Sequence, residues 1–262
     1  MRRLALCADD YGAGATSDAG ILRLARTGRL GAVSCQVAAP GFAAAAPALR
    51  EVEGAVDLGL HLDLAAGRGG LLPLLVRSHA RALSRPALGE RIARQLDAFE
   101  AALGRPPAFV DGHQHVHALP VIRDTLLDLL AARYPAPGPA IRNTAALRTR
   151  GAKAALLGLL GGRGLRRALR ARGIPHNADF AGVYGLGPGA DYRSLFRGWL
   201  AGAADGALLM CHPGLPPGDP DDPIAPARAA ELAYLAAPEL EADCAEAGVR
   251  LARFTEIARG GA

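Results

Sequence analysis

The stretch FVDGHQHVHALP, residues 109–120, places one aspartate and three histidines at every second position after an apolar pair. The four polar residues are Asp111, His113, His115 and His117. In a continuous strand they would share one face, and a buried strand tolerates that polarity only beside a metal ion, a substrate or water. If the chain turns helical after Gly112 instead, His113 and His117 form an i, i+4 pair. Either geometry supplies at least one metal ligand and leaves another histidine for a substrate.

Short apolar runs alternate with helical patterns on both sides of this stretch. The expected strands cover residues 4–8, 32–38, 55–64, 108–117, 140–143, 206–214 and 248–254. The expected helices cover residues 17–28, 88–104, 120–134, 227–235 and 238–248. This alternation predicts a mainly parallel sheet covered by helices. The glycine-rich segment GVYGLGPG, residues 182–189, is expected to be a loop, because it lacks the strand-to-helix setting of a dinucleotide site.

Polar residues gather where the expected strands end. They are Asp9, Asp10, His61, the His113 group, Arg142 and His212. In a β/α barrel the carboxyl ends of the strands form the face that carries active sites, so these side chains should converge there. The sequence therefore predicts an α/β fold, with an incomplete or complete β/α barrel as the first choice and a doubly wound open sheet as the second.

The composition sets broad limits on fold and partners. A chain of 262 residues that is 50% hydrophobic suits one large α/β domain or two small ones, and we expect a single domain over residues 1–262. The formal charge of +5 is a weak sign of anionic partners, because Lys153 is the only lysine and the remaining basic residues are arginines. Aromatic residues make up 5% of the chain, too few for the stacking surfaces of nucleic-acid binding, which we do not expect.

The cysteine pattern and the lack of long apolar runs favour a cytoplasmic protein. Cys7, Cys35, Cys211 and Cys244 are scattered without a CxxC pair, which is typical of reduced thiols. No apolar run reaches the roughly 18 residues of a membrane span, so no integral membrane segment is expected. The basic segment 162–173 is best explained as an exposed helix, although peripheral contact with an anionic or lipid surface stays open. Homo-oligomers also stay open, because the sequence carries no readable trace of oligomeric state.

Each polar motif has a structural and a catalytic interpretation. ADDYG, residues 8–12, either caps a helix or uses one carboxylate for a cation and the other for a proton. His61 in LGLHLDL is either a hydrogen-bonded core residue or a ligand oriented by Asp63. His212 in MCHPG and Arg142 in IRN have ordinary structural explanations when each is taken alone. The catalytic interpretation depends on the motifs occurring together.

Taken in order, the motifs ADDYG, GLHL, DGHQHVH, IRN and CHPG resemble those of the YdjC-like carbohydrate deacetylases, which include chitooligosaccharide deacetylases and hopanoid-associated homologues. The similarity runs from Leu4 to about Phe254. Tyr11 stands where such proteins usually have phenylalanine, a mild departure. The resemblance implies an irregular seven-stranded β/α barrel related to polysaccharide deacetylases.

The resemblance also implies roles for individual residues. The implied ligands of one divalent metal ion, Mg²⁺ or Zn²⁺, are Asp10, His61 and His113. The implied catalytic group is Asp9 as base, His212 as acid and Arg142 as the residue that orients Asp9. The implied substrate-binding residues are His115, His117 and Asp111. Together these roles suit a hydrolase that removes the N-acetyl group from an N-acetylated amino sugar, free, oligomeric or lipid-linked.

The chemistry of the residues agrees with this expectation. An Asp/His/His site leaves coordination positions open, and its ion can bring the pKa of a water molecule towards about 7 and polarise an acetamide carbonyl. A nearby carboxylate can take the proton, and a protonated histidine can donate one to the leaving amine. Two alternatives stay open: a hydrolase of another bond, such as a two-metal phosphoesterase, and a metal- or sugar-binding barrel without catalysis.

Overall fold

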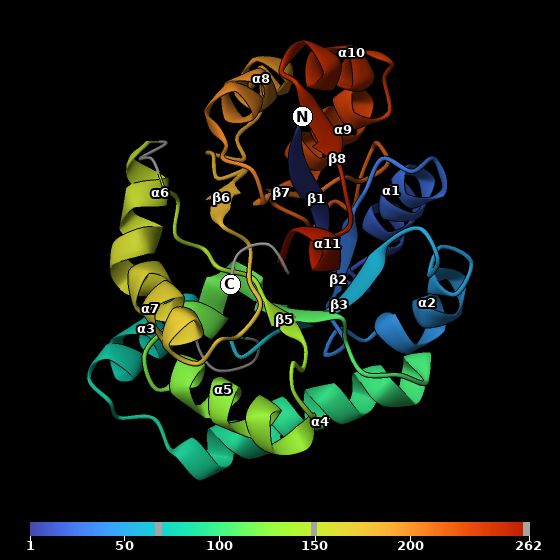
Figure 1. The fold of residues 1–262 in the computed structure, drawn as a ribbon. Coiled ribbons are helices and arrows are strands. Elements are labelled where there is room, and N and C mark those ends of the chain that lie inside the picture. Colours follow the sequence, from blue (N-terminus) through green and yellow to red (C-terminus); the bar gives the residue numbers. More distant parts are fainter. Residues whose placement is uncertain (66–69, 148–150, 259–262) are drawn as a thin grey trace.

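The computed structural model describes residues 1–65, 70–147 and 151–258 (Figure 1). The described strands are β1 (Arg2–Tyr11), β2 (Ala32–Cys35), β3 (Asp57–Leu62), β4 (Phe109–Gly112), β5 (Ala140–Ile141), β6 (Asp179–Ala181), β7 (Ala207–Cys211) and β8 (Val249–Leu251). The described α-helices are α1 (Ala15–Arg26), α2 (Phe42–Leu49), α3 (Leu71–His79), α4 (Arg85–Leu103), α5 (Ile122–Arg133), α6 (Ala152–Leu157), α7 (Arg163–Ala171), α8 (Tyr192–Gly202), α9 (Ala225–Leu235), α10 (Glu239–Glu246) and α11 (Phe254–Ala258). A 3₁₀ turn, η1 (His113–Ala118), follows β4, and a π-helical turn, η2 (Gly158–Gly162), joins α6 to α7.

The sheet is parallel and curls into a barrel that lacks regular pairing at one seam. Its strand order is β5-β4-β3-β2-β1-β7-β6, and the short β8 pairs with the start of β1. The order follows the chain around a ring, without the reversal that characterises a doubly wound sheet. At the seam between β5 and β6, Ile141 forms one parallel bridge with His176, and Asn143 and Asn177 exchange hydrogen bonds. The predicted barrel is confirmed.

The interior of the barrel changes from apolar to polar along the strands. Because alternate residues face inward, β1 presents Ala5, Cys7 and then Asp9, while β4 presents Phe109 and then Asp111. The apolar layer is closed at the amino ends by α11, whose Phe254 packs edge-on against Phe109 with ring centroids 4.9 Å apart. The polar layer above it is therefore surrounded by protein on all sides except the carboxyl ends of the strands.

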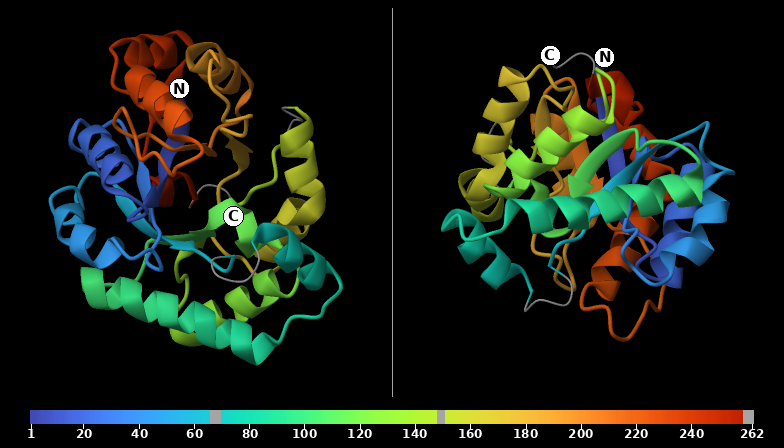
Figure 2. Two further views of the ribbon diagram at one scale, coloured as in Figure 1. Left: turned by 180° about the vertical axis from the view of Figure 1, so that it is seen from behind. Right: turned by 90° about the horizontal axis from the view of Figure 1, so that it is seen from below.

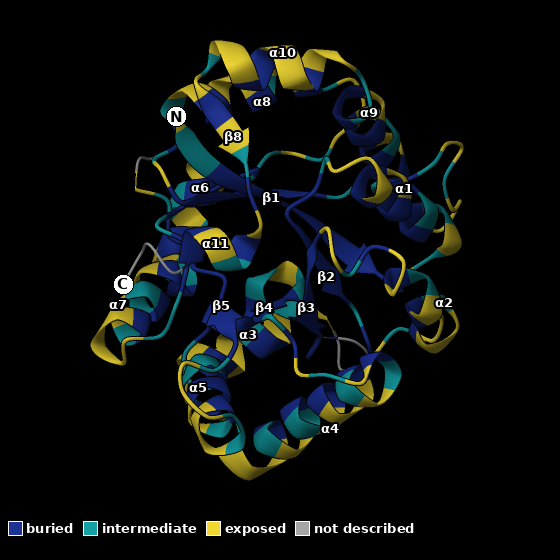
Figure 3. Cartoon of the chain, turned by 45° about the vertical axis from the view of Figure 1, so that its right-hand side comes forward, coloured by how far each residue is buried: buried dark blue, intermediate teal, exposed yellow. Residues whose placement is uncertain are grey.

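The helices cover the outside of this barrel (Figures 1 and 2). Figure 3 shows buried strands at the centre, while the helices are buried on their inner faces and exposed on their outer faces. The larger hydrophobic cluster fills the space between sheet and helices, with contributions from Leu6 on β1, Ile21 on α1 and Leu96 on α4. Within the described residues, no helix is both long and apolar enough to cross a membrane.

The sequence predicted most elements but not all of them. The strand expected over residues 108–117 ends at Gly112, because Gln114 and His115 adopt left-handed φ values of 52° and 60° that a strand cannot contain. The structure adds β6 and several helices that were not predicted, among them α2, α3, α8 and α11. β6 has three residues, too few for a readable alternation, and α2 is mostly alanine with an internal Pro47. The expected loop over residues 182–189 contains no helix or strand.

Candidate active site

Asp9 and Asp10 lie at a bulge near the end of β1. The register against β2 slips between Ala8 and Tyr11, and Asp10 has a left-handed φ of 69°. Such a bulge re-aims the side chains beside it, so the two neighbouring carboxylates take different partners although both are almost fully buried. Asp9 turns to Arg142, and Asp10 turns to two histidines and a second arginine.

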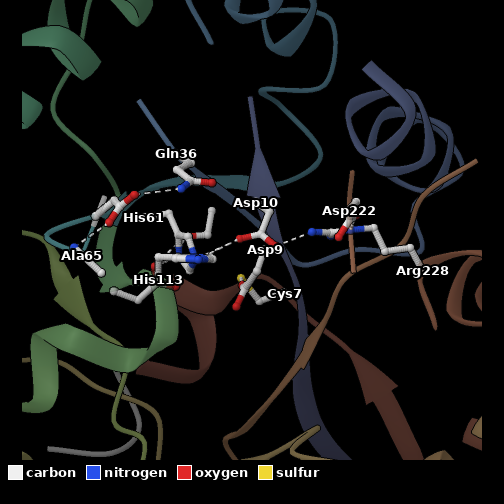
Figure 4. Close-up of polar contacts among 12 residues, drawn as sticks. Cys7, Asp9, Asp10, Gln36, His61, Ala65, His113, Asp222 and Arg228 are labelled. Atoms are coloured by element: carbon white, nitrogen blue, oxygen red, sulfur yellow. Dashed lines mark hydrogen bonds and ion pairs between the residues drawn. The ribbon is translucent and has the colours of Figure 1, made fainter. Parts of the chain in front are cut away.

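The three expected metal ligands lie together. Asp10 Oδ1 is 3.3 Å from His61 Nε2 and 3.1 Å from His113 Nδ1, and these donor atoms all lie within 4.8 Å of one another. Figure 4 shows His61 and His113 beside Asp10. One carboxylate and two imidazoles form a donor set that suits Zn²⁺ and leaves coordination positions open for water and substrate. The residues present therefore fit the implied ion.

The surroundings of His61 favour a positive charge at this place. His61 Nδ1 lies 2.6 Å from Asp111 Oδ1, so its other nitrogen, Nε2, faces Asp10. Burial alone would lower the pKa of His61, but the charge of Asp111 and hydrogen bonds to Asp10 and Asp111 raise it to about 10. A potential that stabilises a proton here also favours a metal cation. A carboxylate behind a ligating histidine is a common support in metal sites.

Arg142 holds Asp9 with both ends of its guanidinium group. Arg142 Nη1 donates to Asp9 Oδ2 at 2.7 Å, and Arg142 Nη2 donates to Asp9 Oδ1 at 2.5 Å. Burial would raise the pKa of Asp9, but the charge and hydrogen bonds of Arg142 outweigh it and hold that pKa well below its usual range. Asp9 is therefore ionised and held in a fixed orientation by Arg142.

The same guanidinium occupies a second group of possible metal donors. Cys7, Asp9 and Asp111 offer donor atoms within 4.8 Å of one another. Arg142 Nη2 lies 3.0 Å from Cys7 Sγ, 2.5 Å from Asp9 Oδ1 and 2.5 Å from Asp111 Oδ2. A cation already fills this space, so the cluster does not suit a second metal ion.

Asp111 and His117 take positions that do not agree with the substrate-binding role expected for them. Neither has exposed surface, so a substrate could not touch them. Asp111 accepts a hydrogen bond from Ser34 and contacts His61 and Arg142, while His117 Nε2 donates to the backbone carbonyl of Arg142 at 2.9 Å. Both residues lie behind the site. Asp63, expected to orient His61, instead accepts a hydrogen bond from Gln36.

His115 reaches the site because η1 bends the chain sharply. Its left-handed backbone turns the ring towards Phe180, with centroids 5.5 Å apart in an edge-on arrangement. Burial and the charge of Arg142 hold the pKa of His115 well below its usual value, so the ring is neutral. His115 Nδ1 is buried without a hydrogen-bond partner among the described residues. A neutral imidazole with a free nitrogen can accept or donate a hydrogen bond to a ligand.

His212 follows β7 and is supported by a buried glutamate. Glu231 on α9 accepts the His212 backbone N–H at 2.5 Å, and Glu231 Oε1 lies 3.8 Å from His212 Nδ1. Burial alone would lower the pKa of His212, but the charges of Glu231, Asp10 and Asp9 raise it. Tyr184 holds the other side of Glu231 by donating to Oε1 at 2.6 Å. These contacts favour the protonated form of His212.

These side chains line a cavity of about 380 Å³, within the usual range of small-molecule sites. Its polar side holds the metal-donor set, Asp9, His115 and His212, and its apolar side includes Leu186, Met210 and Ile224. A second hollow of about 290 Å³ shares Asp10, His113, Asp222 and Arg228 with the first. The cavity thus has room for a sugar-sized ligand against the converging polar groups.

The sequence did not point to Ser34, Asp222, Arg228 or Glu231. Arg228 and Glu231 belong to ARAAELAYL, where a charged pair three residues apart on a buried helix was the available signal. Ser34 is a hydroxyl in an otherwise apolar strand, and Asp222 lies in an aspartate-rich loop. Neither carries a pattern that marks it as part of the site.

Known proteins resemble this chain along nearly its whole length. A carbohydrate deacetylase of Homo sapiens is 29% identical, covering 97% of this chain and 91% of that protein. A chitooligosaccharide deacetylase of Serratia marcescens is 30% identical, covering 95% and 97% of the two chains. Both relatives align with this chain over nearly its whole length, which is the region that carries the motifs described above.

Two solved structures share the fold. An Enterococcus faecalis protein, described as a candidate cellobiose-phosphate cleavage protein, superimposes with a TM-score of 0.70 at 18% identity, covering 98% of this chain and 99% of that one. A T48 deacetylase solved with substrate superimposes with a TM-score of 0.51 at 13% identity, covering 100% and 92%. At such low identity these similarities concern the barrel alone.

The sequence model of the YdjC-like protein family matches residues 3–246, which include the metal-donor set, the Asp9–Arg142 pair and the His212–Glu231 pair. This match and the full-length relatives show that the chain belongs to the YdjC-like family.

Proposed function

We propose that this chain is a metal-dependent carbohydrate N-deacetylase that hydrolyses the acetamide of an N-acetylated amino sugar. The observation that carries the proposal is the meeting of three groups at one cavity: the Asp10–His61–His113 donor set, the ionised Asp9 and the acidic His212. The deacetylase names of relatives that align over nearly the whole chain support the same reaction.

Asp10, His61 and His113 would hold one divalent ion. Such an ion, when bound, polarises the acetamide carbonyl and makes a neighbouring water more acidic. The donor set accommodates Zn²⁺, and Mg²⁺ is the alternative ion. Asp111 and Ser34 would keep the ring of His61 turned towards the ion, because both contact its Nδ1.

Asp9 would accept the proton of the attacking water. Its low pKa makes it a weak base, so it can deprotonate water only where a neighbouring cation has already raised the acidity of that water. Arg142 would fix the carboxylate in position through the whole reaction, since both carboxylate oxygens are held. The proposed base, Asp9, and one proposed metal ligand, Asp10, are thus consecutive residues of β1.

His212 would donate the proton that the departing amine needs. Its raised pKa favours the protonated form that this role needs, and Glu231 and Tyr184 hold the segment that carries it. His115 would contact the substrate through its unpartnered nitrogen, while the apolar wall of Leu186, Met210 and Ile224 would receive apolar parts of the sugar. Arg142 in the second donor cluster disfavours a two-metal phosphoesterase.

The test is acetate release from N,N′-diacetylchitobiose by protein stripped of metal and resupplied with one ion at a time. We expect acetate only with a divalent ion. Asp9→Asn should lose more than 99% of turnover and still bind the ion, because the substitution removes the proton acceptor and not a ligand. Full turnover without any ion, or in Asp9→Asn, would contradict the proposed mechanism. An active wild type that loses ion binding in Asp9→Asn would make Asp9 a ligand.

A further inference from the structure

Arg228 binds the carboxylate of Asp10, one of the three proposed metal ligands. Arg228 Nη2 donates to Asp10 Oδ2 at 2.7 Å, and Arg228 Nε donates to Asp222 Oδ2 at 2.5 Å. The arginine is 7% exposed, and its Nη1 is buried with no hydrogen-bond partner among the described residues. Figure 4 shows the guanidinium with Asp10 on one side and Asp222 beside it. It stands at the wall shared by the two hollows.

This contact divides the two oxygens of Asp10 between different tasks. Oδ1 faces His61 and His113, and Oδ2 is bound by Arg228. A carboxylate bound in this way offers a cation one oxygen, because a charge-assisted hydrogen bond occupies the other. Bidentate ligation by Asp10 would bring the cation against the oxygen that already binds the positively charged Arg228, which is electrostatically unfavourable.

Gly214 of the CHPG motif lies against both the backbone and the side-chain carbons of Arg228. The Gly214 N–H donates to the Arg228 carbonyl at 3.1 Å. A Cβ atom at Gly214 would lie 3.1 Å from Arg228 Cβ and 3.2 Å from Arg228 Cδ, a closer approach than side chains normally make. The absence of a side chain at Gly214 therefore leaves room for the Arg228 side chain, which runs from α9 to Asp10.

We propose that Arg228 is a positioning residue that limits Asp10 to one metal-binding oxygen and thereby makes the site select small ions over Ca²⁺. The proposal rests on the metal site of the proposed function. Ca²⁺ binds six to eight oxygens and takes carboxylates in bidentate fashion, whereas Zn²⁺ is satisfied by about four nitrogen and oxygen ligands. Arg228 removes the oxygen that Ca²⁺ would need and leaves the one that Zn²⁺ uses.

A selectivity role has a signature that a structural role lacks. Without Arg228, the second oxygen of Asp10 becomes free and a positive charge beside the ion disappears. Affinity for Ca²⁺ should then rise more than affinity for Zn²⁺. If Arg228 only kept the site folded, its loss would weaken all ions together.

The experiment is calorimetric titration of the full-length, metal-stripped protein with CaCl₂ and with ZnCl₂. For Arg228→Gln, we expect the ratio of the Ca²⁺ Kd to the Zn²⁺ Kd to fall about tenfold, the effect of one modest charge-assisted contact. Arg228→Lys should retain part of the selectivity, because its ammonium can still contact Oδ2. Arg193→Gln is the control: Arg193 also donates to aspartate through two nitrogens, here both to Asp243, but it lines neither hollow, so the ratio should stay unchanged.

Asp222→Asn provides a second, milder perturbation in case Arg228→Gln does not fold. It weakens the anchor of Arg228 Nε and should lower the ratio in the same direction by less. An unchanged ratio, or a parallel loss of both ions, in every folded Arg228 and Asp222 variant would overturn the positioning role while the wild type still binds its ion. A wild type that binds no divalent ion would instead overturn the metal site itself, and the positioning role with it.

Discussion

Single charged residues in this site work in pairs that fix both position and protonation. Arg142 keeps Asp9 ionised, Arg228 holds one oxygen of Asp10, and Glu231 keeps His212 acidic. Burying an unpaired charge costs free energy, and these pairs lie in the protein interior. Each residue therefore offsets part of the cost of burying its partner. Asp9, Asp10 and His212 therefore depend on charged neighbours for their ionisation state or position.

Glu231 should set the alkaline limit of activity. The charge of Glu231 raises the pKa of His212, and the proposed acid works only while protonated, which is below that pKa. In Glu231→Gln the pKa of His212 should fall towards its ordinary value. The high-pH limb of kcat should therefore move to lower pH, while kcat on the acidic side of the limb changes less. Initial rates of acetate release across pH 5–10 measure this shift.

Tyr184→Phe separates the charge of Glu231 from its packing. Tyr184 donates a hydrogen bond to Glu231, which partly neutralises the carboxylate. Its removal should move the same limb to higher pH, opposite to Glu231→Gln. The groups that face His212 also include Asp9 and Asp10, which both variants leave intact. If the limb stays in place in Glu231→Gln, another group sets it.

The site residues that could be predicted are those that form dense local motifs. Asp9, Asp10 and His113 belong to short runs of polar residues that end apolar strands, which is a strong signal. Arg228 and Glu231 reach the site from a helix more than 200 residues after Asp10, so only the fold brings them there. The roles of Asp111 and His117 were misjudged because spacing alone does not say how deep a side chain lies.

At the scale of elements, the polar ends of β3 and β4 depend on close packing lower in the barrel. Gly59 on β3 lies opposite Phe109 on β4, and a Cβ atom at Gly59 would stand 2.4 Å from the Phe109 ring. The ring cannot retreat freely, because Phe254 of α11 packs against it. Gly59→Ala should therefore destabilise the fold by about 1–3 kcal/mol through overpacking. Urea unfolding measures the change.

A glycine elsewhere serves as the control for this substitution. Gly54 is exposed and has open space around its Cβ position, so Gly54→Ala should change the free energy of unfolding by less than about 0.5 kcal/mol. Phe109→Leu combined with Gly59→Ala should lose less stability than the sum of the single changes, because the smaller side chain relieves the clash. Simple additivity of the two changes would argue against direct packing between these residues.

Elements with a strong period were predictable, and elements defined by exceptions were not. The amphipathic helix α4 and the apolar strands β1 and β7 carry their pattern over many residues. The end of β4 is different: Gln114 and His115 take left-handed backbone angles because η1 must turn His113 and His115 into the cavity. Alternating histidines predicted a longer strand, and the alternative of a helical turn after Gly112 did not specify the left-handed backbone at Gln114 and His115.

At the scale of the whole molecule, the barrel seam and the site are stabilised by the same buried polar layer. Asn143 and Asn177 bridge the two edge strands, and the neighbouring Arg142 binds Asp9 and Asp111 across the interior. His117 closes this layer by donating to the carbonyl of Arg142. The protonation state of such a layer should affect global stability as well as activity.

His117 should make the fold sensitive to acid. Burial lowers the pKa of His117 from 6.5 to about 4, so between these values the unfolded chain binds a proton that the folded chain does not. The free energy of unfolding should fall as the pH drops from 6.5 to 4, by about 3 kcal/mol for this residue. Above pH 6.5 the protonation of His117 should not change it.

His117→Gln keeps a donor for the Arg142 carbonyl but cannot titrate. Its free energy of unfolding should therefore lose less than that of the wild type between pH 6.5 and 4, whereas exposed His79→Gln should follow the wild type. Parallel curves for the wild type and His117→Gln would show that His117 is not the acid-sensitive group.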